Sequence, residues 1–328
     1  MLPITKKDIL RGVLDNIVWF ILLLVLIGFS AGIRGFAQWG IYRNILYHAV
    51  FVGILAIGEA LCIIGRELDL SVESVLGLAT VVTAYLTGSS SDASGLLLNG
   101  FLTLGIVLLI GVLIGLFNAF LIVKLKISSF IITLSSYLIF RAVGLVITKG
   151  HGVIKLRPEV VAVARINLGP IPLLVIIMVF VYALFYFILT RTQFGRHLYL
   201  VGDSREASFN AGIRVSNVLF GVFILSGVLS AFAGWLLAAR TNGSSPGIGV
   251  GMLFEAFAAV VIGGVSLQGG VGRLTGVFAG AILLSAISTA ISILGMPPFY
   301  MNIIRGGFII IAVLIDAIIT RVRPRLMR

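Results

Sequence analysis

The sequence predicts an all-α polytopic integral membrane protein, because its composition is apolar and its apolar runs are long and unbroken. Of the 328 residues, 59% are hydrophobic and 11% are charged, and the mean hydropathy is +1.18. Soluble domains carry about 25% charged residues, so this chain has too few to cover a solvated surface. A transmembrane β-barrel would show alternating strands of about ten residues, which the continuous runs here do not resemble.

Apolar runs long enough for a bilayer recur along the whole chain. A membrane-crossing helix needs about 20 apolar residues, which predicts about ten spans in one transmembrane domain, residues 1–328. The eighth run is short and leads into a glycine-rich stretch, so it is predicted to be a half-helix or re-entrant segment. The predicted spans are 16–33, 45–65, 71–87, 96–123, 128–148, 171–189, 216–239, 253–267, 275–294 and 299–320.

Basic residues are distributed unequally between the two sides that ten spans define. Fifteen fall on the side of both termini and seven on the other, which predicts that both termini are cytoplasmic. The fifteen are Lys6, Lys7, Arg11, Arg66, Lys124, Lys126, Arg191, Arg196, Arg205, Arg214, Arg273, Arg321, Arg323, Arg325 and Arg328. The first apolar run follows basic residues as in a signal peptide, but without a clear cleavage site, which favours an uncleaved helix.

Residues 190–216, here called the polar island, form a long basic segment between two apolar spans. Within it, Glu206-Ala207-Ser208 is followed by Gly212, which gives the pattern E-A-S-x-x-x-G. This pattern resembles the short helix and turn by which permeases of ABC importers dock on their ATPase. The resemblance implies a docking loop that includes Arg205, Glu206, Ala207, Ser208, Gly212 and Ile213.

Two further motifs resemble one branch of those permeases, the ribose-type family that carries simple sugars. The run Asp69-Leu70-Ser71-Val72 is similar to its first signature, and residues 263–272 are similar to its second. Phe194-Gly195-Arg196 is similar to its cytoplasmic loop, and the likeness extends from about residue 45 to Asp316. The chain departs from the family at Glu59, at Arg66-Glu67 and at Glu73. At the position of Glu73 the family usually has glycine.

The resemblance implies a permease subunit in the plasma (inner) membrane that moves a monosaccharide or similar small polar solute. The implied partners are an ABC ATPase subunit, a second permease subunit (identical or homologous) and an external solute-binding protein. ATP is expected on the ATPase, with no cofactor bound by this chain, because the chain contains no Gly-Lys pair of a P-loop. The loop at 148–170 is either a resting place for an external partner or a simple connector.

Acidic and basic residues near or inside the spans are the candidates for the translocation pathway. Asp69 and Ser71 suit a helix start, where capping of backbone N–H groups is favoured over solute contact, and Glu73 fits the same logic. Glu59, Arg141 and Glu255 lie inside spans, where an isolated charge costs at least about 2.5–3.5 kcal/mol. Structural pairing, for instance between Glu59 and Arg141, is favoured over solute binding.

The glycines Gly263, Gly264, Gly269, Gly270 and Gly272 lack the lysine of a phosphate cradle. They are instead predicted to allow a tight turn or close helix packing. The scattered histidines suggest no metal site or catalytic triad, Cys62 is predicted to be a buried apolar residue, and nucleic-acid binding is not expected. The remaining alternatives are an ion-coupled secondary transporter and, more remotely, a membrane-embedded enzyme.

Overall fold

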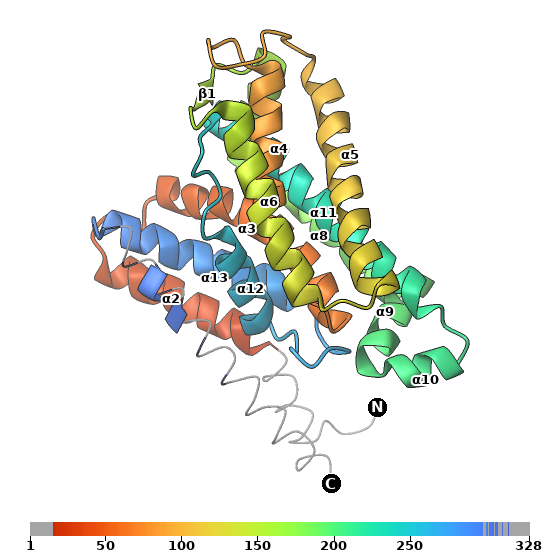
Figure 1. Cartoon of the computed structure of the whole chain (residues 1–328). Helices are drawn as coiled ribbons and strands as arrows, with labels where there is room; N and C mark the ends of the chain where they lie inside the picture. Colours follow the sequence, from red (N-terminus) through yellow and green to blue (C-terminus); the bar gives the residue numbers. More distant parts are fainter. Residues whose placement is uncertain are drawn as a thin grey trace.

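The computed structural model describes residues 16–297, together with residues 300, 302–304, 306, 307, 310 and 314. The described part is a bundle of helices with a few two-residue strands (Figure 1). The elements are α2 (Ile17–Gly32), α3 (Trp39–Ile64), α4 (Val72–Thr87), α5 (Gly100–Ala119), the π-helix η1 (Phe120–Lys124), α6 (Ser129–Thr148), β1 (Val153–Ile154), α7 (Pro158–Arg165), β2 (Asn167–Leu168), β3 (Ile171–Pro172), α8 (Leu173–Arg191), α9 (Gln193–Asp203), α10 (Arg205–Asn210), α11 (Val215–Thr241), β4 (Gly243–Ser244), α12 (Met252–Ile262) and α13 (Leu274–Ile293).

The predicted all-α membrane fold is confirmed, but the described residues do not confirm the count of about ten spans. In the described part, six helices are long and apolar enough to cross a bilayer, and three shorter apolar ones are α2, α4 and α12. These nine coincide with the first nine predicted spans, with the largest shift at α3, which begins at Trp39. Of the tenth predicted span, 299–320, the structure describes only residues 300, 302–304, 306, 307, 310 and 314, so the span lies mostly outside the described residues.

The bundle has two distinct ends. Helices α9 and α10, which form most of the polar island, lie at the lower end of the view in Figure 1, and β1 lies at the upper end. At the upper end β1 pairs antiparallel with β4, with Val153 opposite Ser244, and the small ladder β2–β3 precedes α8. We call the end that carries α9 and α10 the island end, and the end that carries β1 and β4 the strand end.

Two of the short helices begin inside the bundle rather than at a surface. The segment before α4 folds back beside α3, and the Asp69 carboxylate there accepts a hydrogen bond from Ser226, in the middle of α11. Helix α12 begins where the backbone N–H of Gly251 meets the Glu73 carboxylate of α4. With 11 residues, α12 is about 16 Å long, well short of a hydrocarbon core of about 30 Å. The eighth predicted span therefore contains a short helix, which agrees in length with the predicted half-helix or re-entrant segment.

The packing of the helices around α3 and α11 is repeated. These two long helices pack against each other, and α4 and α5 pack on α11 as α12 and α13 pack on α3. Helix α4 ends beside the strands, where Gly88 bridges to Leu156, whereas α12 leads to the island end, so the two short helices run in opposite directions. This arrangement is typical of inverted repeats. The segments that correspond in the two repeats are those that precede α4 and α12.

Glycines allow α5 and α11 to cross at very short distance. A Cβ on Gly227 of α11 would lie 2.2 Å from the Gly111 carbonyl oxygen of α5, and one on Gly115 would lie 2.4 Å from the Phe223 oxygen. Gly111 and Gly115 form the spacing G-x-x-x-G, which permits close approach of helix backbones in a membrane. The contact is backbone against backbone, so no side-chain rotation can relieve a substitution there.

We expect Gly227→Ala to destabilise the protein by about 1–3 kcal/mol, because the added methyl group must push α5 away from α11. The matched control is Gly105→Ala on α5, where a Cβ would have no neighbour within 4 Å. The measurement is the thermal unfolding midpoint of each purified variant in detergent. Equal midpoints for the two variants would contradict this account of the crossing.

Candidate functional site

The polar island is built from two capped helices. Thr192 caps α9 by accepting a hydrogen bond from the Gly195 N–H at 3.3 Å, and Ser204 caps α10 by accepting one from the Ala207 N–H at 3.2 Å. Helix α9 buries Leu198 and Val201 against the bundle. These local signals make the island an ordered structure rather than a loose connector.

Helix α10 presents one face to solvent and packs the other inward. Glu206 and Ala207 are exposed, whereas Ser208 and Ile213 are buried. Gly212 is exposed with φ +81°, and the hydrogen bond from the Ile213 N–H to the Ser208 oxygen closes the turn around it. Only glycine adopts this φ without strain, so Gly212 ends the helix and aims the chain into α11.

The largest exposed apolar side chain of the island was missed by sequence reasoning. Phe209 lies between the E-A-S residues and Gly212, and 73% of its surface is exposed. An aromatic residue on a short polar helix is a signal for a contact surface. Its place in the middle of the motif therefore adds it to the predicted docking residues.

The island is fastened to the end of α3. Arg205 is partly exposed, and its guanidinium donates to the Glu67 carboxylate at 2.7 Å and to the Arg66 carbonyl at 3.2 Å. On α9, a Cβ at Gly202 would lie 1.8 Å from the Ile64 oxygen, so the two backbones touch. Arg205, predicted as a docking residue, thus holds the island in place within this chain.

The glycine-rich stretch 263–272 forms a tight turn packed on the island, as predicted. Gly264, Gly269 and Gly270 all have positive φ, and a Cβ on Gly272 would meet the Val265 side chain. A Cβ on Gly263 would lie 2.6 Å from the Val277 nitrogen, so this glycine allows α12 and α13 to approach. The Gly270 N–H donates to the Ile64 oxygen at 2.9 Å, and the Tyr199 hydroxyl donates to the Gly272 oxygen at 2.9 Å.

Asp69 is the centre of a buried polar network. Its Oδ1 accepts hydrogen bonds from the Ser71 backbone N–H and hydroxyl, and its Oδ2 accepts one from the Ser226 hydroxyl at 2.7 Å. The network continues through Asn118, which donates to the Ser71 hydroxyl and accepts from Ser136. The predicted capping by Asp69 reaches only the backbone N–H of Ser71, the residue just before α4, so Asp69 closes the turn that leads into the helix. For Ser71 the predicted capping is wrong, because its hydroxyl joins the side-chain network instead of accepting a backbone N–H.

The predicted pairing of Glu59 with Arg141 is wrong. Glu59 is fully buried near Asp69, and among the described residues it makes no ion pair with Arg141. The Arg141 guanidinium instead donates to the Ile248 oxygen at 3.0 Å, and it lies over Gly77 near Glu73. Burial indicates that a charge needs a partner, but it does not say which one.

Two more buried carboxylates hold α12. Glu73 Oε2 accepts from the Gly251 N–H at 2.9 Å and the Leu253 N–H at 3.1 Å, so it caps α12 across the bundle. This differs from the predicted role of Glu73, which is to cap its own helix, α4. Glu255, in the first turn of α12, accepts from the Ser288 hydroxyl at 3.0 Å and lies 3.8 Å from His48 Nε2.

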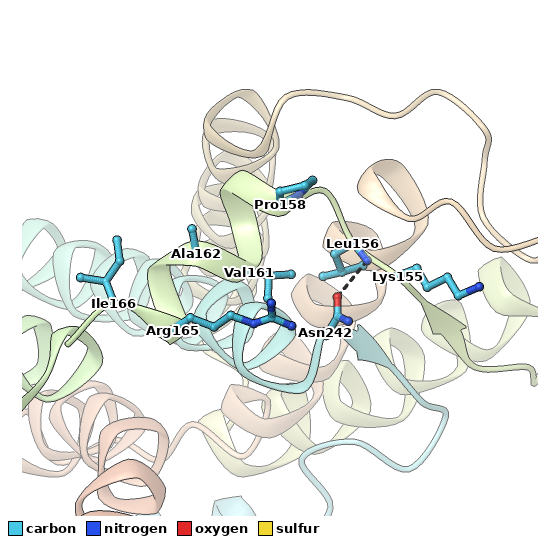
Figure 2. A pocket seen from close by; sticks show the side chains of 8 residues that line it. All are labelled: Lys155, Leu156, Pro158, Val161, Ala162, Arg165, Ile166 and Asn242. Atoms are coloured by element: carbon cyan, nitrogen blue, oxygen red, sulfur yellow. Dashed lines mark hydrogen bonds between the residues drawn. The ribbon is translucent and has the colours of Figure 1, made fainter.

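A pocket of about 430 Å³ lies at the strand end, between α7 and the end of α11. Figure 2 shows Arg165 reaching from α7 toward Asn242, whose side-chain oxygen accepts the Leu156 N–H at 3.1 Å, while Lys155 points away. The other lining residues are Pro158, Val161, Ala162 and Ile166. Lys155 and Arg165 are the only charged residues that line it, and within the described residues neither makes an ion pair within 4 Å. The pocket is therefore basic.

Comparisons with known proteins agree with the architecture. Residues 41–313 match a family model described as "Branched-chain amino acid transport system / permease component". The ribose import permease protein of Haemophilus influenzae is 33% identical over 302 residues, which cover 90% of this chain and 91% of that protein. The xylose transport system permease protein of the same organism is 32% identical, over 83% and 88% of the two chains.

A third relative, the L-arabinose ABC transporter permease protein of Azospirillum brasilense, is 30% identical over 84% of this chain and 79% of its own. No solved structure matches. A multi-pass helical bundle, the polar island and matches that span nearly the whole chain together define a membrane permease. The chain belongs to the ribose-type family of permease subunits of ABC importers.

We expect Ser226→Ala to cost about 1–3 kcal/mol, because it leaves one oxygen of the buried Asp69 carboxylate without its hydrogen bond. The matched control is Ser230→Ala, one turn further along α11, since the Ser230 hydroxyl donates only to the Ser226 carbonyl of its own helix. Thermal unfolding midpoints in detergent separate the two. A Ser230 variant that is as unstable as the Ser226 variant would refute the role given to Asp69.

Proposed function

We propose that this permease moves a monosaccharide or similar small polar solute through the inner membrane, driven by an ATPase on a separate subunit. The support for the solute class is that the relatives described above are named for ribose, xylose and L-arabinose. Support for a separate ATPase comes from the sequence, which lacks the Gly-Lys pair of a P-loop. None of those relatives is named as an ion-coupled transporter.

The observation that carries the mechanism is the exposed face of α10. Glu206, Ala207 and Phe209 project from a helix that is capped at both ends and fastened to α3. A rigid projection of this kind suits insertion into a groove of the ATPase, where closure by ATP displaces it. ATP needs to favour one helix packing over the other by only a few kcal/mol to switch the side on which the pathway is open.

The proposed orientation places the polar island and both termini in the cytoplasm, following the excess of basic residues on that side. The strand end then faces outward, toward the external solute-binding protein. The basic pocket beside Arg165 suits an acidic side chain of that protein, since a guanidinium binds carboxylates well. A second permease subunit, identical or homologous, completes the pathway.

We expect Gly212→Pro to abolish ATP-driven uptake while leaving membrane insertion intact, because proline cannot adopt the positive φ that aims the chain from α10 into α11. The matched control is Gly95→Pro, at another exposed glycine with positive φ, which lies at the strand end. Ribose uptake into proteoliposomes that contain the ATPase and the binding protein measures the difference. Normal uptake by the Gly212 variant would contradict a docking role for the island.

We expect Arg165→Glu to weaken the stimulation of ATPase activity by the binding protein by about tenfold, because a like charge then faces the acidic partner. The control is Lys149→Glu, an exposed lysine at the same end that does not line the pocket. ATPase activity is measured against binding-protein concentration at two salt concentrations. Equal losses in both variants would assign the effect to the general charge of this end and not to the pocket.

A further inference from the structure

Helix α12 begins inside the bundle without a side-chain cap of its own. Its N-cap residue is Gly251, at φ +89°, which has no side chain with which to accept a hydrogen bond. The first N–H groups of any helix lack intrahelical partners, and water is scarce in the interior of a membrane protein. The start of α12 therefore depends on an acceptor from another part of the chain.

Glu73 supplies that acceptor from the first turn of α4. One carboxylate oxygen accepts both α12 N–H groups, and the other accepts the Tyr137 hydroxyl at 3.4 Å. Only 1% of the Glu73 side chain is exposed. The negative charge lies at the positive ends of two helix dipoles at once, that of α4 and that of α12, so both helices stabilise it.

At its other end α12 continues into the glycine-rich turn, which rests on the island. The turn is held by the hydrogen bonds from Gly270 to Ile64 and from Tyr199 to Gly272. A continuous line of contacts thus runs from α9 through the turn and α12 to Glu73 and α4. Glu73 is the residue through which this line of contacts passes from α12 to α4.

We propose that Glu73 is a positioning residue that makes α4 and α12 move as one rigid unit during transport, so that displacement of the island reaches α4 through α12. This inference rests on the proposed function in one respect, namely that ATP displaces the island. The rigidity of the α4–α12 connection itself rests on the contacts of Glu73. The two claims are separated by the measurements below.

The test uses the permease purified in complex with its ATPase and carrying spin labels. In a Cys62→Ala background, one label pair is placed by Tyr85→Cys on α4 and Phe254→Cys on α12, and a second pair by Phe180→Cys on α8 and Phe254→Cys. Phe180 and Phe254 are exposed, and Tyr85 is partly exposed. Double electron–electron resonance spectroscopy measures the distance between the two labels of each pair with and without ATP. We expect the α4–α12 distance to stay constant while the α8–α12 distance changes.

If ATP changes the α4–α12 distance in the protein that retains Glu73, the proposal that these helices move as one rigid unit is overturned. This holds whatever the second label pair shows. If neither distance responds to ATP, the ATP-driven motion of the proposed function fails, and the transmission through Glu73 fails with it. Constancy of the first distance with a change in the second supports both. None of these outcomes requires a Glu73 variant to fold.

Substitution of Glu73 adds a functional measurement. We expect Glu73→Ala to reduce solute uptake by about tenfold or more while ATP hydrolysis continues, and to make the α4–α12 distance depend on ATP. Glu73→Gln retains an oxygen acceptor for the Gly251 and Leu253 N–H groups, so we expect intermediate uptake and a nearly constant distance. An alanine variant with normal uptake and a constant distance would overturn the proposal.

Discussion

Helices that begin inside a membrane protein must find acceptors for their first backbone N–H groups, and this requirement organises the centre of the molecule. Glu73 meets it at the start of α12, and nearby Asp69 accepts the backbone N–H of Ser71, the residue just before α4. Each carboxylate is buried and is held by several donors, so its charge is spread over hydrogen bonds rather than neutralised by a single cation. The same residues thereby fix the irregular segments that precede the two short helices.

Close backbone packing supplies the second constraint. The crossing of α5 and α11 at Gly111 and Gly227 brings the helices together without side chains between them, and the contact of Gly202 with Ile64 does the same for the island. In an apolar solvent, dispersion contacts and small residues, rather than the hydrophobic effect, hold helices together. Glycine therefore serves here for close approach at crossings and for turns with positive φ elsewhere.

The spans, the polar island and the glycine turn could be predicted from the sequence because each is encoded locally, by hydropathy, by charge or by glycine spacing. The short eighth helix was predicted for the same reason. The partner of Glu73 could not be predicted, since Gly251 is distant in the sequence and a backbone N–H leaves no mark in it. Likewise, the error over Glu59 and Arg141 arose because the depth of a residue in a span does not reveal which way its side chain faces. In the docking motif, Ser208 and Ile213 turned inward and Arg205 toward Glu67, since the motif records the helix but not its exposed face.

The packing of the polar island on the end of α3 has a consequence for which segments related permeases could exchange. The island rests on the end of α3, at the Ile64 backbone and the Glu67 carboxylate, and on the turn around Gly270, two segments that lie far apart along the chain. If residues 190–216 alone were transferred into a relative, they would lack the segments on which they pack in this protein. The smallest unit that includes these contacts comprises the island, the end of α3 and the turn that follows α12. Recombination between family members would have to keep these three segments together.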